Sequence, residues 1–186
     1  MQEQERLRQQ GVQAKLPSLV MRSLLLFLTL PLFILDQATK QWTVERFAPP
    51  GNFEHDHITV IPGWFDLVRV HNTGVAFGMA NGAKGANYIF GAVSAAALGL
   101  IWWLWKTGAF PTKLSRLAVA LLLSGIFGNL ADRIFRGYVV DFLSVDLKFM
   151  QWPAFNVADA AICIAAGCLF ISAFQKTPEL PSRSAG

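Results

Sequence analysis

The chain has 186 residues, of which 53% are hydrophobic and only 15% are charged, whereas about 25% are charged in an ordinary soluble domain. This composition excludes a disordered, collagen-like or disulfide-rich chain, and the 15 Phe and 6 Trp residues give more apolar surface than one core of this size can hide from water. The net charge of +4 is spread over short polar segments between apolar runs. We therefore predict an integral membrane protein that does not bind nucleic acid.

Four stretches of the sequence carry no charged residue, and they span residues 23–35, 85–105, 117–131 and 160–175. Only the second has the ~20 residues that cross a bilayer core. The other three become long enough if each helix continues past one acidic residue, which is Asp36, Asp132 or Asp159. The sequence thus predicts an all-α membrane bundle of four transmembrane helices.

The Lys and Arg residues orient these four spans. An even number of spans places both termini on one side, and that side carries nine basic and three acidic residues against seven and nine on the other. The positive-inside rule then places the termini in the cytoplasm and the three aspartates at the outer helix ends. A cleaved signal peptide is the alternative for the first run, but the run ends in Asp36-Gln37-Ala38 without a small-x-small cleavage site, so we expect it to be retained.

The longest segment between spans contains a predicted β-hairpin on the outer side. Residues 58–61, the turn Pro62-Gly63 and the partly alternating residues 64–70 form its pattern. The hairpin either lies at the lipid headgroup boundary, through Trp64, Phe65, Phe53 and Phe47, or only caps the helix ends. The expected organisation is a polar N-terminal tail (1–17), one membrane domain (18–175) with the outer cap at about 41–84 and a second outer loop at 136–153, and a C-terminal tail (176–186).

Ionisable residues at membrane depth indicate function by default. Asp36 and Lys40 have the i, i+4 spacing of an ion pair on a helix surface. At the end of the third span, Asn129, Asp132 and Arg133 share one helix face, where the Asp and Arg can neutralise each other or reach polar partners on neighbouring helices. Taken alone, both groups are explained as buried structural pairs.

Four more polar residues lie between the spans or at the start of the fourth span. Asn156 is a suitable N-cap for the fourth span, with Asp159 at the third helical position, where the helix dipole favours an anion. Asn72 begins a Gly-containing segment typical of a turn. Asp141 is different, because it lies among apolar residues with no basic residue within four positions.

Two aspartates in unequal environments are the minimum requirement for one kind of hydrolysis. Close carboxylates cannot both ionise, so the pair shares a proton, and one member can activate water while the other donates to a carbonyl. Asp141 and Asp159 fit these roles. His55, His57 and His71 lack metal-ligand spacing. The alternatives are a transporter or proton pathway, for which polar residues at several depths are expected, and a Mg²⁺-dependent lipid phosphatase.

Five motifs, in this order, resemble those of the bacterial lipoprotein signal peptidases (signal peptidase II), which are aspartic peptidases of the inner membrane. They are Asp36-Gln37-Ala38-Thr39-Lys40, Asn72-Thr73-Gly74-Val75-Ala76-Phe77, Gly128-Asn129-Leu130-Ala131-Asp132-Arg133, Val139-Val140-Asp141-Phe142 and Phe155-Asn156-Val157-Ala158-Asp159.

The resemblance implies that Asp141 and Asp159 are the catalytic dyad. It implies supporting roles for Asp36, Lys40, Asn72, Asn129, Asp132, Arg133 and Asn156. It also implies a prolipoprotein substrate whose Cys carries a diacylglyceryl group and which is cut just before that Cys, with membrane lipid as a partner and with no metal or cofactor. The hairpin would then form a substrate-facing cradle.

Overall fold

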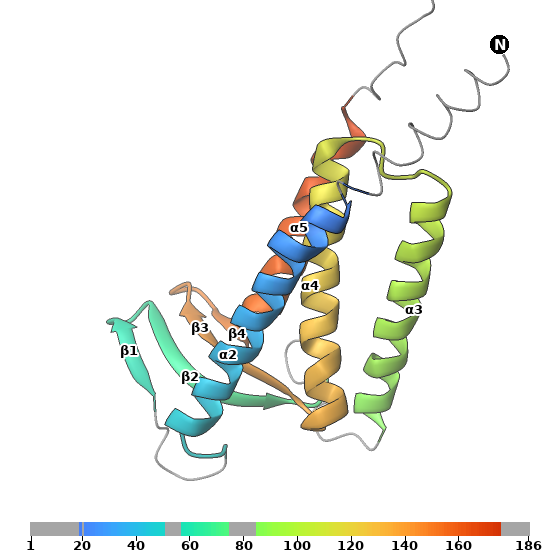
Figure 1. The fold of residues 1–186 in the computed structure, drawn as a ribbon. Coiled ribbons are helices and arrows are strands. Elements are labelled where there is room, and N and C mark those ends of the chain that lie inside the picture. The colour runs from blue at the N-terminus through green and yellow to red at the C-terminus, as the bar shows by residue number, and fades with distance from the viewer. Residues whose placement is uncertain (1–18, 20, 51–56, 75–84, 176–186) are drawn as a thin grey trace, which may run out of the picture.

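The computed structural model describes residues 19, 21–50, 57–74 and 85–175. The predicted tails (1–17 and 176–186) and the end of the motif that begins at Asn72 lie outside the described residues. The helices are η1 (Leu25–Thr29), which is a short π-helix, α2 (Leu30–Arg46), α3 (Ala86–Lys106), α4 (Lys113–Phe135) and α5 (Val157–Ala173), as shown in Figure 1.

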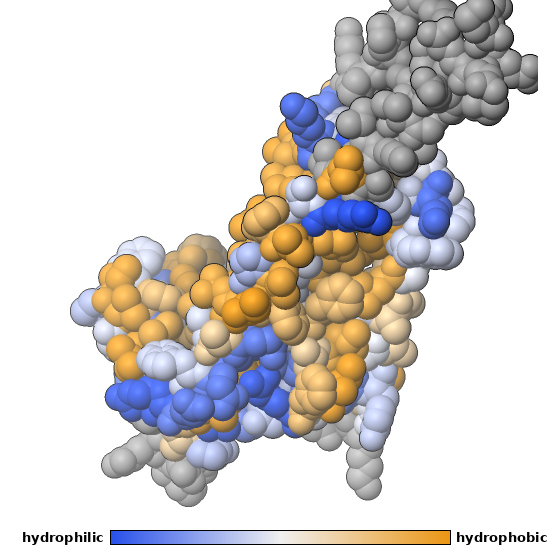
Figure 2. Space-filling view, viewed as in Figure 1, coloured by the Kyte–Doolittle hydropathy of each residue, from blue (hydrophilic) through white to orange (hydrophobic). Residues whose placement is uncertain are grey.

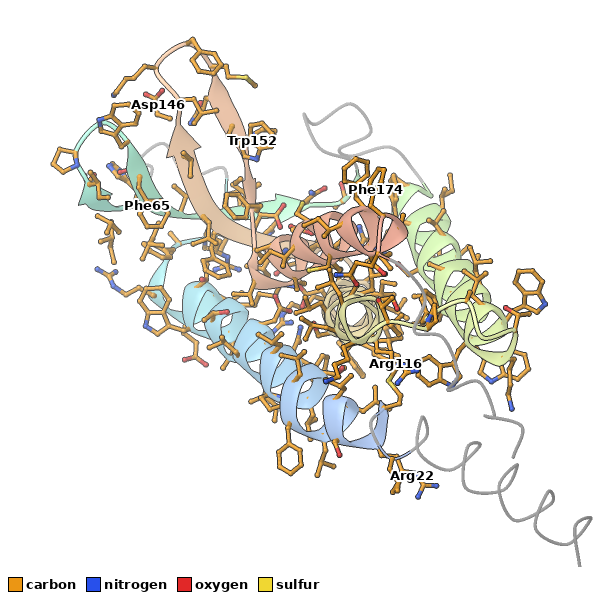
Figure 3. All side chains as sticks on the ribbon, turned by 90° about the horizontal axis from the view of Figure 1, so that it is seen from above. Arg22, Phe65, Arg116, Asp146, Trp152 and Phe174 are labelled. Atoms are coloured by element: carbon orange, nitrogen blue, oxygen red, sulfur yellow. The ribbon has the colours of Figure 1, made fainter. Side chains whose placement is uncertain are left out.

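Helix α4 is the centre of the bundle, and Figure 3 shows it between α2, α3 and α5. Its contact with α5 is close because both helices present small residues to each other. A Cβ built at Gly125 of α4 would lie 2.4 Å from the carbonyl oxygen of Ala158 in α5. Helix α3 packs against α4 around Ile101 and Val119 and leaves most of its own side chains exposed.

Three helical segments are long and apolar enough to cross a membrane, and these are Met21–Arg46, Ala86–Lys106 and Lys113–Phe135. Helix α5 is apolar but shorter, with 17 residues. Large apolar side chains such as Phe27, Tyr88 and Phe170 are exposed, and Figure 2 shows a mostly apolar surface along the bundle. An apolar exposed surface of this kind is typical of a protein whose helices face lipid.

The prediction that three apolar runs continue past an aspartate is confirmed. Helix α2 continues beyond Asp36 to Arg46, and α4 continues beyond Asp132 to Phe135. Helix α5 begins at Val157, before Asp159. The three aspartates therefore lie on helices, with Asp36 well inside α2, Asp132 in the last turn of α4 and Asp159 in the first turn of α5.

A four-stranded antiparallel sheet, in the order β1-β2-β3-β4, lies at the Arg46 end of α2 (Figure 1). Its strands are β1 (Ile58–Ile61), β2 (Phe65–Asn72), β3 (Val139–Asp146) and β4 (Gln151–Phe155). The predicted hairpin is confirmed as β1 and β2. The expectation of a plain loop at 136–153 is wrong, because this segment supplies β3 and most of β4.

The two missed strands have a physical explanation. The first four residues of β3 are all buried, so this strand does not show the polar-apolar alternation by which a half-exposed strand is recognised. Strand β4 contains Pro153, which argues against a strand in the sequence but is tolerated at a sheet edge. Strand β3 pairs Val139 with Asn72 of β2, which satisfies backbone groups that β2 would otherwise leave unpaired.

The sheet is attached to the ends of α4 and α2. Gly137, at φ +79°, turns the chain from α4 into β3, and Arg69 of β2 donates to the carbonyl oxygens of Val44 and Phe47. The expectation that Phe47 faces lipid headgroups is wrong, since its side chain is 2% exposed and lies edge-on to Trp42. Trp64 is exposed as expected, Phe65 is half-buried, and Phe53 lies outside the described residues.

Candidate active site

Lys40 is the central cation of a buried polar cluster between α2 and α4. Its Nζ lies 2.9 Å from Oδ2 of Asp36 and 3.2 Å from Oδ2 of Asp132, and it donates to Oδ1 of Asn129 at 3.0 Å. The three charged side chains are at most 1% exposed. The predicted Asp36–Lys40 pair is therefore confirmed, and it is part of a larger network that joins two helices.

Asp36 and Asp132 also bind backbone groups near the dyad residues. Oδ1 of Asp36 accepts from the backbone N–H of Ala158 at 2.9 Å, one residue before Asp159. Oδ2 of Asp132 accepts from the backbone N–H of Val140 at 3.0 Å, one residue before Asp141. Each supporting carboxylate thus fixes the main chain next to one predicted dyad residue.

The second cation at Asp132 is Arg136 rather than the adjacent Arg133. The guanidinium of Arg133 instead lies over the ring of Phe90 in α3, 5.5 Å from its centroid, and its Nη1 donates to the carbonyl oxygen of Asn129 at 3.2 Å. The sequence left open whether Asp132 pairs with Arg133 or with polar residues on neighbouring helices. In the structure Asp132 pairs with Lys40 on α2 and with Arg136, just beyond the end of α4.

Asn156 joins the two predicted dyad residues and is fully buried. Its side-chain oxygen accepts from the backbone N–H of Asp159 at 2.9 Å, and Oδ2 of Asp159 accepts from the backbone N–H of Asn156 at 3.2 Å. This reciprocal arrangement is a capping box, so the predicted N-cap is confirmed. The Nδ2 of Asn156 also donates to Oδ1 of Asp141 at 2.7 Å.

Asp141 is held by amides rather than by a cation. Besides the bond from Asn156, its Oδ2 accepts from Nδ2 of Asn72 at 2.9 Å, and the residue is 2% exposed. Burial raises the pKa of Asp141 to about 7, and the negative charge of Asp159 adds to this effect, while the bonds from Asn72 and Asn156 and the charge of Lys40 oppose it. A carboxyl in this environment carries a proton over part of the neutral pH range.

Asp159 is half-buried and accepts from Nδ2 of Asn129 at 2.7 Å. Asn129 thus connects Asp159 to Lys40, since its side-chain oxygen accepts from the ammonium group. The Nδ2 of Asn156 also lies 3.2 Å from the same oxygen of Asn129. Asn156 therefore contacts both aspartates, whereas Asn129 contacts Asp159 alone.

The structure brings the predicted site residues into one cluster near the Phe135 end of α4. Eight of them are joined by direct hydrogen bonds or ion pairs between their side chains, and Arg133 is joined through the carbonyl of Asn129. Asp146 is 49% exposed and pairs with Lys148 away from the bundle.

Three further residues of this cluster were missed by sequence reasoning. Arg136 binds Asp132, and its i, i+4 spacing from that residue was a readable signal. Gln37 donates to Oδ2 of Asp36 at 3.1 Å. Gly128 leaves the space for Asp36, because a Cβ there would lie 2.6 Å from the carboxylate oxygen, and this close approach has no sequence signal other than the glycine itself.

Within the described part of the chain, no three His, Cys, Asp or Glu side chains are arranged to hold a metal ion. His71 stacks on Tyr138, with ring centroids 3.8 Å apart, and its Nε2 accepts from Nε of Arg69 at 3.0 Å. Burial and the charge of Arg69 lower the pKa of His71, so the ring is neutral at pH 7. His71 thus contacts Arg69 and Tyr138 rather than the polar cluster around Lys40. The charged side chains bonded into that cluster are the aspartates, Lys40, Arg133 and Arg136.

These observations define a membrane protein with an amide-held pair of aspartates, one buried and one half-buried, at one end of a helical bundle. Residues 28–175 match the family model described as Signal peptidase (SPase) II. The chain belongs to the signal peptidase II family, and it is a peptidase.

Curated relatives agree with this family, and a solved structure shares the fold. The lipoprotein signal peptidase of Pseudoalteromonas atlantica is 36% identical over 152 residues, covering 81% of this chain and 88% of that protein. The lipoprotein signal peptidase of Syntrophotalea carbinolica is 38% identical over 154 residues, covering 83% and 92%. A bacterial membrane enzyme solved by the in meso method at 2.3 Å has the same fold, with a TM-score of 0.69, 24% identity and coverage of 84% and 93%.

Proposed function

We propose that this peptidase is an intramembrane aspartic endopeptidase that removes the signal peptide from diacylglyceryl-modified prolipoproteins by cutting just before the lipidated Cys. The names of the relatives support the substrate class. The single observation that carries the proposal is the bridge formed by Asn156, which caps the helix at Asp159 and donates to Asp141. This bridge connects the carboxyl group of Asp141 to the helix turn that carries Asp159.

The proposed mechanism needs one ionised and one protonated carboxyl in the dyad. The ionised carboxylate takes a proton from water as the water oxygen bonds to the scissile carbonyl carbon, and the protonated carboxyl donates to the carbonyl oxygen. When the tetrahedral intermediate collapses, the C–N bond breaks and the leaving nitrogen takes the proton that the first carboxylate had removed from water. The second carboxylate takes back a proton from a hydroxyl of the intermediate, which restores the single shared proton. The dyad titrates as a pair, so the mechanism requires one shared proton without assigning it to either residue.

The supporting residues hold this pair in place. Asn72 and Asn156 orient Asp141, and Asn129 orients Asp159. Lys40 neutralises Asp36 and Asp132, which in turn bind the main chain next to each dyad residue. The positive charge of Arg133 faces the dyad from α4 and would stabilise negative charge that develops on the substrate.

We further propose that α5 is a fourth span, that both termini are cytoplasmic, and that residues 18–175 form one domain of the bacterial inner membrane with its site near the outer leaflet. The apolar length of α5 and the distribution of Lys and Arg support this topology. Fusion of a reporter that is active only outside the cytoplasm tests it. The reporter should be inactive after residue 175 and active when inserted in the β3–β4 turn, and the reverse result would refute the orientation.

The far end of the sheet carries exposed apolar side chains at its two turns. Figure 3 shows Phe65, Asp146 and Trp152 far from the helix bundle, and Ile61, Trp64, Phe149 and Trp152 are 47–82% exposed. Lys148 lies over the ring of Trp64, 5.0 Å from its centroid. Trp and Lys together suit a lipid headgroup region, so we propose that this end contacts lipid, including the acyl chains of the substrate.

The combined substitution Trp64→Ser with Trp152→Ser tests this role of the sheet. We expect slower cleavage of a diacylglyceryl substrate, with the thermal midpoint of unfolding in detergent close to that of the wild type. Gln151→Ser, at the exposed position beside Trp152, is the control. Unchanged turnover by the double variant would show that the apolar turns serve only as a cap.

The dyad itself is tested with purified protein and a diacylglyceryl prolipoprotein. Asp141→Asn and Asp159→Asn should each lower cleavage by about 10³-fold or more, because each removes one half of the acid-base pair. Asp146→Asn, on the same strand as Asp141 but exposed, is the matched control and should retain activity. Cleavage that survives either dyad substitution would overturn the assignment, and inhibition by EDTA would favour a Mg²⁺-dependent enzyme instead.

A further inference from the structure

Arg136 connects the outer ends of α2 and α4. It is the first residue after α4, and its guanidinium pairs with Oδ1 of Asp132. The same group donates to Oε1 of Gln37 at 3.2 Å and to Oε1 of Gln41 at 2.9 Å, both on α2. One side chain, 19% exposed, therefore holds Asp132 from the side opposite to Lys40 and ties it to the neighbouring helix.

The other oxygen of Asp132 points to the strand that carries Asp141. Oδ2 accepts from the backbone N–H of Val140 and lies 3.2 Å from Lys40. Since Asp132 is 0% exposed, its carboxylate orientation is set by these contacts rather than by water. A bidentate carboxylate held by one cation on each side has little freedom to rotate.

The direct ion pairs neutralise both Asp36 and Asp132 only when Arg136 is counted. Asp36 and Asp132 are two carboxylates, and Lys40 supplies one positive charge to both. Arg136 supplies the second. An unpaired carboxylate in such a buried position is costly, so a missing cation must change either the structure or the protonation of the cluster.

We propose that Arg136 is a positioning residue of this enzyme, which holds the Asp132 carboxylate so that it fixes Val140 and thereby places Asp141 for catalysis. This inference rests on the proposed function of Asp141 and Asp159. Arg136 does not act on the substrate itself. It acts through Asp132 and through the main chain at the start of β3.

The pH dependence of activity distinguishes a role of Arg136 in placing Asp141 from a purely structural role, in which Arg136 only connects α4 to α2. Charged groups from several neighbouring elements lie near Asp132 and Asp141. They are Asp36 and Lys40 of α2, Arg133 at the end of α4, Arg136 and Asp159 of α5. Strand β2 contributes the neutral Asn72. Loss of Arg136 leaves one more negative charge in this group, which favours the protonated dyad and moves the pH profile of activity to higher pH.

The test measures kcat, KM and their pH profiles for Arg136→Gln, Arg136→Lys and Gln41→Leu. Lys113→Gln, at an exposed cation that begins α4 at the end opposite to Arg136, is the control. For Arg136→Gln we expect kcat to fall about tenfold with KM changed less than twofold, and the profile to move up by about half a pH unit. Arg136→Lys should restore the pH profile but only part of kcat. Gln41→Leu should lower kcat slightly without a pH shift.

The outcomes are distinguishable from a failure of the proposed function. If Asp141→Asn abolishes cleavage while Arg136→Gln keeps the kcat and pH profile of the wild type, the dyad stands and the role of Arg136 is wrong. If Arg136→Gln does not fold, the Lys variant and Gln41→Leu carry the test. Equal losses with no pH shift in Arg136→Gln and Gln41→Leu would mean that Arg136 only braces α2.

Discussion

Asn156 donates from its side-chain amide to Oδ1 of Asp141 at 2.7 Å, although the two residues belong to different elements. Asn156 is fully buried and is also the N-cap of α5. A helix cap requires only an acceptor, whereas orienting Asp141 requires a donor. Because asparagine provides both, the start of the helix and the geometry of the dyad depend on one side chain.

Substitution of Asn156 should separate these two tasks. Asn156→Ser keeps an N-cap oxygen but loses the donor to Asp141, so we expect cleavage about 10- to 100-fold slower with a small change in thermal midpoint. Asn156→Ala loses the cap as well and should destabilise the protein by a further ~1 kcal/mol. Melting curves and cleavage rates of the two variants check this. Equal rates for Asn156→Ser and the wild type would contradict the role of the amide.

Lys40 should be among the most sensitive positions for stability. Lys40→Met removes the cation that joins two buried carboxylates, and breaking such a pair costs about 3–5 kcal/mol. Adding Asp36→Asn should recover part of the loss, because one unpaired charge is then removed. Thermal unfolding in detergent measures both effects. A double variant less stable than Lys40→Met would show that Asp36 is not held mainly by its charge.

The close approach at Gly128 should tolerate no side chain. A Cβ at this position would lie 2.6 Å from the Asp36 carboxylate and 3.1 Å from Cβ of Ala158. We expect Gly128→Ala to lower stability by about 1–3 kcal/mol and to slow cleavage, since α2 and α5 must both shift. Gly99→Ala on α3 is the matched control, because nothing lies within 4 Å of its Cβ, and it should be neutral or slightly stabilising.

Asp141 should reduce stability at neutral and higher pH. Its pKa rises from 3.8 to about 7 in the folded protein, so the folded state binds a proton more tightly than the unfolded chain. The stability that this proton provides is fully present below pH 3.8 and is lost as the pH rises through about 7. Asp141→Asn removes this dependence. We expect its thermal midpoint to exceed that of the wild type by a few degrees at pH 8 and by less at pH 5.

The comparison that checks this prediction is the difference between the two melting temperatures across that pH range. Asp146→Asn, whose carboxylate is 49% exposed, should give a difference that changes little with pH. A wild-type enzyme that becomes more stable than Asp141→Asn at high pH would contradict the raised pKa.

Much of the candidate site could be predicted from local sequence patterns. The i, i+4 spacing of Asp36 and Lys40 and the capping pattern of Asn156 and Asp159 operate within one helix turn, so their geometry follows from helix periodicity alone. The absence of any local partner for Asp141 was also informative, because its actual partners, Asn72 and Asn156, are 69 and 15 residues away. An acidic residue among apolar residues with no nearby partner in the sequence indicates that its partners come from other elements of the fold.

The sequence by itself determined the class of protein, the apolar helices, the hairpin and the aspartates at their ends, because composition and periodicity record which surfaces avoid water. Only the tertiary structure decided that Lys40 serves two carboxylates, that Arg136 rather than Arg133 pairs with Asp132, and that β3 and β4 complete the sheet. These features depend on which buried groups can reach one another across elements. Buried charges and backbone groups are almost always hydrogen-bonded. The packing of the elements decides which groups pair, and the spacing of residues along the chain does not reveal these pairs.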